Sequence, residues 1–461
     1  MAPALSETAT TETNPEWQGE DVTIRDVLSA LSHIRDTFAH TEAGDDEHPH
    51  PRNCVMTLVT VATNDAEERL AVETSQAISS QHPAQSIVIR EDPAAKGNHL
   101  DARITTEVQR PEMSCATECE VITLNVRGAA AEHLDALVDP LLVSGVPTYL
   151  WWMGTPPFAK PELRDTLRIC DGLVVDSAQF DEPYRTFRGL SELLKVAHHR
   201  LGLADLQWSR LRPWRESIAQ FFTPRERRAF LGGLSEVGVD YQGDGRGNRI
   251  AAAMITGWMA SALGWTLKRA AAGSGGVVVA HYESGGRSIE VAFRSVSREH
   301  LAAGELSAIR MAGSARGVTF RLSVQHDPQR KRNVAEPAYR TLHQTGGEDD
   351  AGIELAERRA GWHRDVLHEN LDSLHHTATG DPPGESRPRR PTVSTVERRQ
   401  LDSTRVLLTL IEVGDSEPLR HVQQLDAEDE TSLLLDLLST GTHDEVFNRS
   451  LAAAAELVEK F

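Results

Sequence analysis

The loop Gln242–Asn248 holds the residues of this chain best suited to binding a phosphate. It contains Gly243, Gly245, Arg246 and Gly247, directly before a stretch that is predicted to be helical. Backbone N–H groups, the helix dipole and the arginine would all attract an anion there. The spacing is neither that of a dinucleotide-binding turn nor that of a P-loop. A flexible turn is therefore the simpler interpretation, and an anion-binding loop is the alternative.

Cys115 and Cys119 are the cysteines with a candidate chemical role. They do not form a Cys-x-x-Cys redox motif, and no second cysteine pair or histidine pair completes a zinc site. In an extended segment their Cα atoms would lie about 13 Å apart, too far for a disulfide. Two reduced thiols are the simpler interpretation, and a redox sensor with a thioredoxin-type partner is the alternative. We predict no catalytic residue, no metal site and no cofactor.

Tryptophan and arginine often dominate protein interfaces, and they gather at two places in this chain. Trp151 and Trp152 are adjacent in a predicted strand, where neighbouring side chains point to opposite faces. One ring is expected in a core, and Trp152 is the candidate for a partner contact. Trp214 stands between Arg212 and Arg215. This second group is either a salt-bridged helix start or an interface anchor.

Charge and composition exclude several classes of protein. Lys and Arg number 48 against 68 Asp and Glu, and the net charge of -20 disfavours nucleic-acid binding. No apolar run approaches the roughly 20 residues that span a bilayer, and the first residues lack the pattern of a secretory signal. Four cysteines do not make a disulfide framework. We expect a cytoplasmic protein with no nucleic-acid or membrane partner.

The elements that must position these residues fall into two expected domains. Near-continuous apolar strands alternate with helical stretches over residues 48–203, which predicts an α/β domain with a mostly parallel sheet. Residues 204–327 and 401–461 contain strands with short glycine-containing connections, which predicts an α+β domain with a largely antiparallel sheet. Residues 1–47 are acidic and residues 328–400 are polar and proline-rich. There we expect a disordered tail and a mostly disordered insertion.

Four short segments follow one another in a characteristic order. They are PTYLWW (147–152), DGLVVDS (171–177), ADLQWSRLRPWRE (204–216) and TGWMASALGW (256–265). Their order and spacing resemble the OpcA family of glucose-6-phosphate dehydrogenase assembly proteins, and its cyanobacterial members in particular. The likeness extends from about residue 54 to 272 and returns in the C-terminal helices.

The resemblance implies a helper protein rather than an enzyme. Members of the family bind glucose-6-phosphate dehydrogenase and promote its active oligomer, which supports the oxidative pentose phosphate pathway and NADPH production. Such a helper activates only if it binds the active state more tightly than the inactive one. From residue type alone, Trp152, Arg212, Trp214 and Arg215 are expected at the contact. The alternative is an α/β enzyme or sensor that binds a sugar phosphate or nucleotide, with Gly243–Gly247 on the phosphate.

Overall fold

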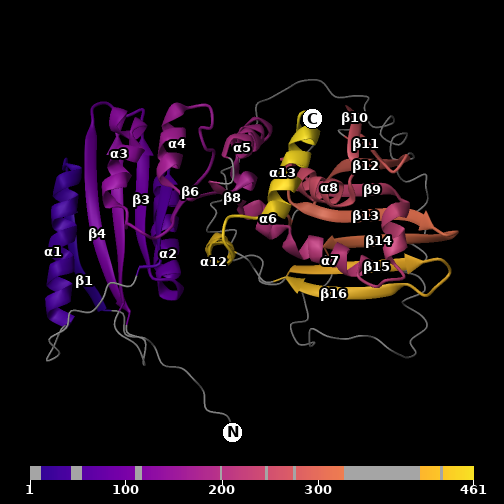
Figure 1. Cartoon of the computed structure of the whole chain (residues 1–461), viewed down its shortest axis with the longest axis horizontal. Helices are drawn as coiled ribbons and strands as arrows, with labels where there is room; N and C mark the ends of the chain where they lie inside the picture. Colours follow the sequence, from indigo (N-terminus) through magenta and orange to yellow (C-terminus); the bar gives the residue numbers. More distant parts are fainter. Residues whose placement is uncertain are drawn as a thin grey trace, which may run out of the picture. The chain divides into compact units, whose positions relative to one another are not determined.

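The chain folds into two compact units, each built on one eight-stranded sheet. The computed structural model describes residues 12–42, 54–109, 117–197, 200–243, 248–273, 277–298, 300–326, 405–425 and 429–460. Unit 1 comprises Met1–Ser209 and Glu430–Asn448, and unit 2 comprises Arg210–Asp429 and Arg449–Phe461. The predicted fold class is confirmed, because the first sheet is mostly parallel and the second mostly antiparallel (Figure 1).

The sheet of unit 1 has the order β1-β4-β5-β3-β2-β6-β7-β8. Its strands are β1 (Glu12–Gly19), β2 (Met56–Ala62), β3 (Ala84–Asp92), β4 (His99–Gln109), β5 (Thr117–Arg127), β6 (Thr148–Trp152), β7 (Gly172–Val175) and β8 (Gly202–Asp205). The strands from β5 across to β8 are parallel, whereas β4 and β1 add an antiparallel edge. Numbered along the chain, the parallel strands lie in the order 3-2-1-4-5-6, which is that of the dinucleotide-binding α/β fold.

Helices cover this parallel sheet. They include α2 (Asp65–Gln81), α3 (Leu134–Val138), α4 (Pro161–Thr166), α5 (Pro183–Ala197) and α12 (Glu430–Thr440), with 3-10 turns η1 (Gly128–Glu132), η2 (Asp139–Leu141), η3 (Leu167–Ile169) and η4 (Ser177–Gln179). Leu58, Val88 and Trp151 share one buried cluster with Ile78 of α2 and Leu434 of α12. The helix α12 therefore completes the core of unit 1, although the sequence placed residues 401–461 together in the C-terminal domain.

The expected N-terminal tail is corrected for the part that the structure describes. Strand β1 pairs antiparallel with β4, and α1 (Ile24–Glu42) follows it at the same edge of the sheet (Figure 1). Val27, Leu31 and Ile34 are buried on one side of α1, at the spacing of an amphipathic helix. The acidic composition masked this apolar stripe. The predicted insertion, in contrast, lies outside the described residues.

The sheet of unit 2 has the order β10-β11-β12-β9-β13-β14-β15-β16. Its strands are β9 (Leu234–Gln242), β10 (Thr266–Ala272), β11 (Val278–Ser284), β12 (Arg287–Val296), β13 (Leu306–Ala315), β14 (Val318–His326), β15 (Arg405–Val413) and β16 (Leu419–Leu425). All neighbours are antiparallel except β12 and β9.

Helices α7 (Arg212–Phe222) and α8 (Ile250–Leu263) and the 3-10 turn η5 (Arg228–Gly233) accompany the sheet of unit 2. Phe221 of α7 stacks on Phe320 of β14, with ring centroids 5.5 Å apart. The chain passes between the units within α6 (Leu206–Arg210) and within α13 (Glu445–Val458). Among the described residues, none of the helices combines the length and the apolar character that a membrane crossing requires.

Candidate functional site at the carboxyl edge of the parallel sheet

The carboxyl ends of the parallel strands are the first place to look for a site in unit 1. In open α/β sheets, ligands bind outside these ends, at the point where the strand order reverses. Here that point lies between β2 and β6, which pair through Val61 and Trp152. The turn after β2, the end of β3 and the loop after β6 therefore define the candidate site.

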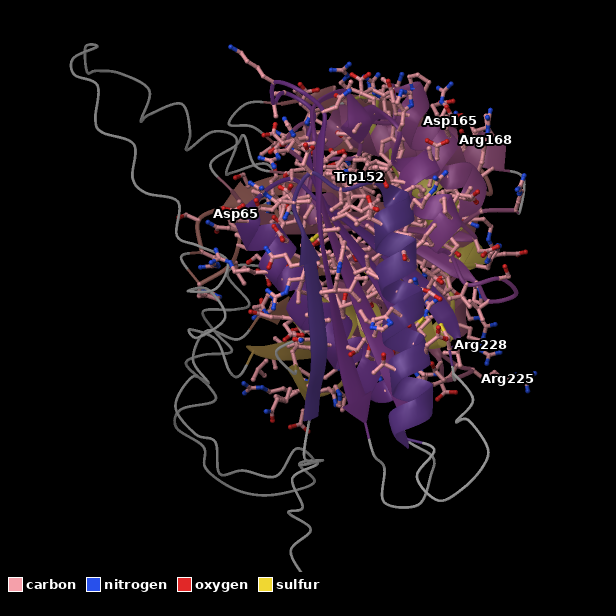
Figure 2. The ribbon with its side chains drawn as sticks, turned by 90° about the vertical axis from the view of Figure 1, so that its left-hand side faces the viewer. Asp65, Trp152, Asp165, Arg168, Arg225 and Arg228 are labelled. Carbon is pink, nitrogen blue, oxygen red and sulfur yellow. The ribbon has the colours of Figure 1, made fainter. Side chains whose placement is uncertain are left out.

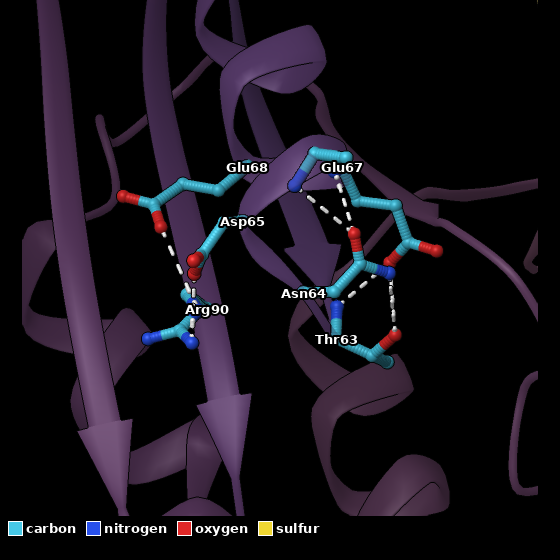
Figure 3. A network of polar contacts seen from close by, with 7 residues as sticks. Thr63, Asn64, Asp65, Glu67, Glu68 and Arg90 are labelled. Atoms are coloured by element: carbon cyan, nitrogen blue, oxygen red, sulfur yellow. Dashed lines mark hydrogen bonds and ion pairs between the residues drawn. The ribbon is translucent and has the colours of Figure 1, made fainter. Parts of the chain in front are cut away.

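The turn after β2 is closed by its own side chains (Figure 3). Asn64 Oδ1 accepts hydrogen bonds from the backbone N–H groups of Ala66 and Glu67, both at 3.0 Å. Glu67 Oε2 in turn accepts from the Thr63 N–H at 2.7 Å and from the Thr63 hydroxyl at 2.9 Å. This reciprocal arrangement is similar to a capping box, except that Glu67 accepts from Thr63, the residue before the N-cap Asn64, and it fixes the start of α2. The pattern Asn-x-x-Glu before an apolar stretch was its sequence signal.

Arg90 of β3 supplies the positive charge beside this turn. Its Nη2 atom lies 2.8 Å from Asp65 Oδ1, and its Nε atom lies 3.8 Å from Glu68 Oε2 (Figure 3). Partial burial raises the pKa of the Glu68 carboxyl, although the Arg90 charge opposes that shift. The arginine is thus engaged by acidic side chains of the same turn.

Glu91, next along β3, is the second unusual carboxyl group at this edge. Burial raises its pKa to about 7, while the Lys160 charge acts in the opposite direction. A carboxyl group that titrates near neutral pH is a candidate proton donor or acceptor. Within the described part of the chain, no group of three His, Cys, Asp or Glu side chains is arranged to hold a metal ion.

Both tryptophans of β6 are buried, so the expected exposure of Trp152 is corrected. Trp151 is 2 % exposed and belongs to the core beside α2 and α12, while Trp152 is 3 % exposed. Adjacent strand residues point to opposite faces, and layers on both faces cover the two rings. In the view of Figure 2, Trp152 is labelled near the middle of the ribbon and Asp65 at its outline. Trp152 therefore offers no surface to a partner.

Replacing Trp152 by Phe is expected to lower the free energy of unfolding by about 1–2 kcal/mol. Ring volume is lost, but so is the indole N–H, which is buried and finds no acceptor among the described residues. Urea unfolding measures this change. Because the ring is buried and iodide does not reach it, its removal is expected to raise the fraction of tryptophan fluorescence that iodide quenches. A clear fall of that fraction in Trp152→Phe would show that the ring is exposed.

Two carboxyl groups meet where β7 and β8 end. Asp205 Oδ1 accepts the N–H groups of Ser177 at 3.0 Å and Gln207 at 2.9 Å, and Asp176 Oδ1 accepts the Ala178 N–H at 3.1 Å. Burial, and next the charge of Asp176, raise the pKa of Asp205 to about 6. Asp205 was not among the site residues expected from sequence. Its position at the end of the short strand β8 was the available signal.

In unit 2, Trp214 is a core residue rather than an exposed anchor. It is 4 % exposed, and its ring meets the edge of His326 with centroids 5.2 Å apart. Arg212 and Arg215, on the same helix α7, are half-buried. The expected exposure of Trp214 is corrected, and the two arginines stay predictions for a partner contact.

The predicted anion loop and cysteine pair are described only in part. Gly243 donates its N–H to the Val296 carbonyl at 3.2 Å, so this donor is engaged within the fold. Gly245, Arg246, Gly247 and Cys115 lie outside the described residues. Cys119 lies in β5 opposite Glu107 of β4. No described contact gives either motif a ligand, and both interpretations stay predictions.

Known proteins match this chain in both units. A family model described as the N-terminal domain of a glucose-6-phosphate dehydrogenase subunit matches residues 75–192. A second model, described as the C-terminal domain of that subunit, matches residues 201–451, which is more than half of the chain.

Curated relatives named OpcA are similar over part of their length. The chain is 35% identical to the protein from Nostoc punctiforme over 34% of its own length and 33% of the relative. It is 30% identical to the protein from Synechococcus elongatus, over 41% and 42% of the two chains. The aligned region thus spans about a third of the first of these relatives. The expected likeness to cyanobacterial members is confirmed.

Two solved structures align with part of the chain at TM-scores below 0.5. The scyllo-inositol dehydrogenase of Lactobacillus casei is 11% identical with a TM-score of 0.35, and the alignment covers 59% of this chain and 76% of that chain. The biliverdin reductase of Synechocystis is 11% identical with a TM-score of 0.31, covering 59% and 81%. The family itself rests on the two ordered model matches. This chain therefore belongs to the OpcA family, whose two domains are described as the N-terminal and C-terminal domains of a glucose-6-phosphate dehydrogenase subunit.

Proposed function

We propose that this chain is a non-catalytic subunit that binds glucose-6-phosphate dehydrogenase and raises its activity by favouring the active oligomer. The observation that carries the proposal is the match, in order, to both domains of one family described as a subunit of that enzyme. The names of the curated relatives, which refer to the OxPP cycle, support the same pathway.

Activation by such a subunit is a linkage effect. A protein that binds the active oligomer more tightly than the inactive enzyme shifts the population toward the active form, by an amount set by the difference in affinity. A stable contact of this kind buries about 800 Å² on each partner. Of the residues expected from sequence, Arg212 and Arg215 are the ones that keep partly exposed side chains for this contact.

Mixing the purified chain with its cognate glucose-6-phosphate dehydrogenase is expected to give one complex in size-exclusion chromatography with light scattering. The complex should show a raised rate or a lowered KM for glucose 6-phosphate, and the chain alone should show no turnover. Arg212→Ala combined with Arg215→Ala should weaken the complex by about tenfold or more, because arginine is a frequent hot-spot residue.

A matched control keeps this experiment specific. Arg225 and Arg228 are exposed arginines in the segment after α7 (Figure 2), and their replacement by Ala should leave the complex unchanged. Melting curves of both double variants show whether α7 stays folded. Absence of a complex together with unchanged kinetics of the cognate enzyme would refute the proposed function.

A further inference from the structure

The turn after β2 stands where this fold binds the pyrophosphate of a dinucleotide. With a strand order of 3-2-1-4-5-6, the pyrophosphate lies at the N-terminus of the helix that follows the first parallel strand. It is held there by free backbone N–H groups, and glycines allow it to approach the backbone. In unit 1 this helix is α2, and the turn Thr63–Glu68 contains no glycine.

Three of the N–H groups in this turn, those of Thr63, Ala66 and Glu67, already have side-chain acceptors. Asn64 Oδ1 takes those of Ala66 and Glu67 in the first turn of α2. Glu67 Oε2 takes the N–H of Thr63 at the end of the strand. These two side-chain oxygens therefore occupy three donors of the turn that would otherwise be available to an anion (Figure 3).

Charge excludes an anion from the same place. Asp65, Glu67 and Glu68 all lie in the first turn of α2. Each carboxylate would repel a phosphate bound at this place. The nearby cation, Arg90, is paired with Asp65 and Glu68. Glu91 lies one residue before the end of β3, where this fold holds a ribose, but a ribose contact would still leave the pyrophosphate facing carboxylates.

We infer that the side chains of Asn64 and Glu67 occupy the phosphate-binding position of this fold, and that unit 1 binds neither NAD(P)+ nor NAD(P)H. The residues present do not fit the dinucleotide that the strand order implies. These two side chains instead fix the start of α2 at the end of β2. This inference goes beyond the proposed function and does not depend on it. Dinucleotide binding and the thermal stability of the turn are both measured on the chain without a partner enzyme.

Titration of the full chain with NADP+, NAD+ and their reduced forms tests the first half of the inference. Isothermal calorimetry and the intrinsic tryptophan fluorescence, to which Trp152 at the end of β6 contributes, report binding. No saturable signal is expected up to about 1 mM ligand. The cognate dehydrogenase, titrated with NADP+ in the same buffer, shows that binding is detectable. Saturable binding of any of these dinucleotides to the chain alone would overturn the inference.

Melting curves of cap variants test the second half. Asn64→Ala and Glu67→Ala should each lower the melting temperature by about 2–4 °C, because donors at the start of α2 lose their acceptors. Glu73→Ala, at an exposed position farther along α2, is the matched control and should melt like the wild type. If Asn64→Ala and Glu67→Ala also melt like the wild type, these side chains do not occupy the phosphate-binding position, and the inference is refuted. Formation of the complex with the dehydrogenase, measured separately, bears only on the proposed function.

Discussion

Arg35→Ala is expected to lower the free energy of unfolding by about 3–5 kcal/mol, although Arg35 lies in a segment whose composition suggested a solvated tail. Its Nε and Nη2 atoms bind the two oxygens of Glu120 at 2.6 and 2.7 Å. The Glu120 side chain is 0 % exposed. Without Arg35, a buried carboxylate loses its bidentate partner, and that loss costs far more than a surface ion pair is worth. Urea unfolding of the full chain measures the change.

Two further variants separate this effect from general damage to α1. Arg25→Ala removes an exposed arginine of the same helix and should change the free energy by less than about 0.5 kcal/mol. Arg35→Ala combined with Glu120→Ala removes both charges and should be less harmful than Arg35→Ala alone. If Arg35→Ala and Arg25→Ala are equally mild, the segment before residue 48 does not pack on the sheet as described.

Asp205→Asn is expected to stabilise the chain above pH 7, by at most about 3 kcal/mol at pH 8. Burial and the neighbouring Asp176 raise the pKa of Asp205 in the folded state to about 6, from an ordinary value of 3.8. Ionised Asp205 is therefore unfavourable in the fold. The amide keeps an oxygen in the place of Oδ1, which accepts the Ser177 and Gln207 N–H groups, and carries no charge.

The direction of the pH dependence follows from that shift. The folded state holds the Asp205 proton more tightly than the unfolded chain does. The contribution of this group to stability is therefore fully present below about pH 4 and is lost as the pH rises through about 6. The variant should gain nothing at pH 4 and most at pH 8. Glu91, whose pKa burial raises to about 7, contributes equally to both proteins and cancels in the difference.

Urea unfolding at a series of pH values compares Asp205→Asn with the wild type. Asp165→Asn is the control, because Asp165 is an exposed member of an i,i+3 ion pair with Arg168 (Figure 2). Its difference from the wild type should be small at every pH. A difference for Asp205→Asn that is flat from pH 4 to 8, or that is destabilising at pH 8, would contradict the assigned pKa shift.

Much of the parallel sheet was predictable because its strands are covered on both faces. Met56–Ala62 is buried at every position, and such strands are continuous apolar runs in sequence. The edge strands β10 and β16 were missed, since most of their residues are exposed and leave no apolar pattern. The sequence prediction assigned helix α12 to the C-terminal domain, whereas it packs in the core of unit 1. Its contact with α2, through Thr431 and Thr74 at 2.8 Å, joins segments 357 residues apart.

The candidate site was less predictable than the fold. The glycine loop at Gly243–Gly247 was a candidate anion-binding site because a sequence shows residue types but not their surroundings. The turn Thr63–Glu68, without glycine, gained meaning only from the strand order, which places it at the switch point. The four family segments identified the family, but they did not show which of their tryptophans are exposed.

Sequence alone is enough to place Trp151 and Trp152 on opposite faces, because alternation is a property of any strand. The pattern Asn-x-x-Glu at Asn64 and Glu67 is likewise visible in the sequence, because capping is local. The burial of both rings and the ion pair of Arg35 with Glu120 are visible only in the folded chain. Those outcomes depend on layers and partners that come from distant parts of the chain. Local rules set where a side chain points, and long-range packing sets what it meets there.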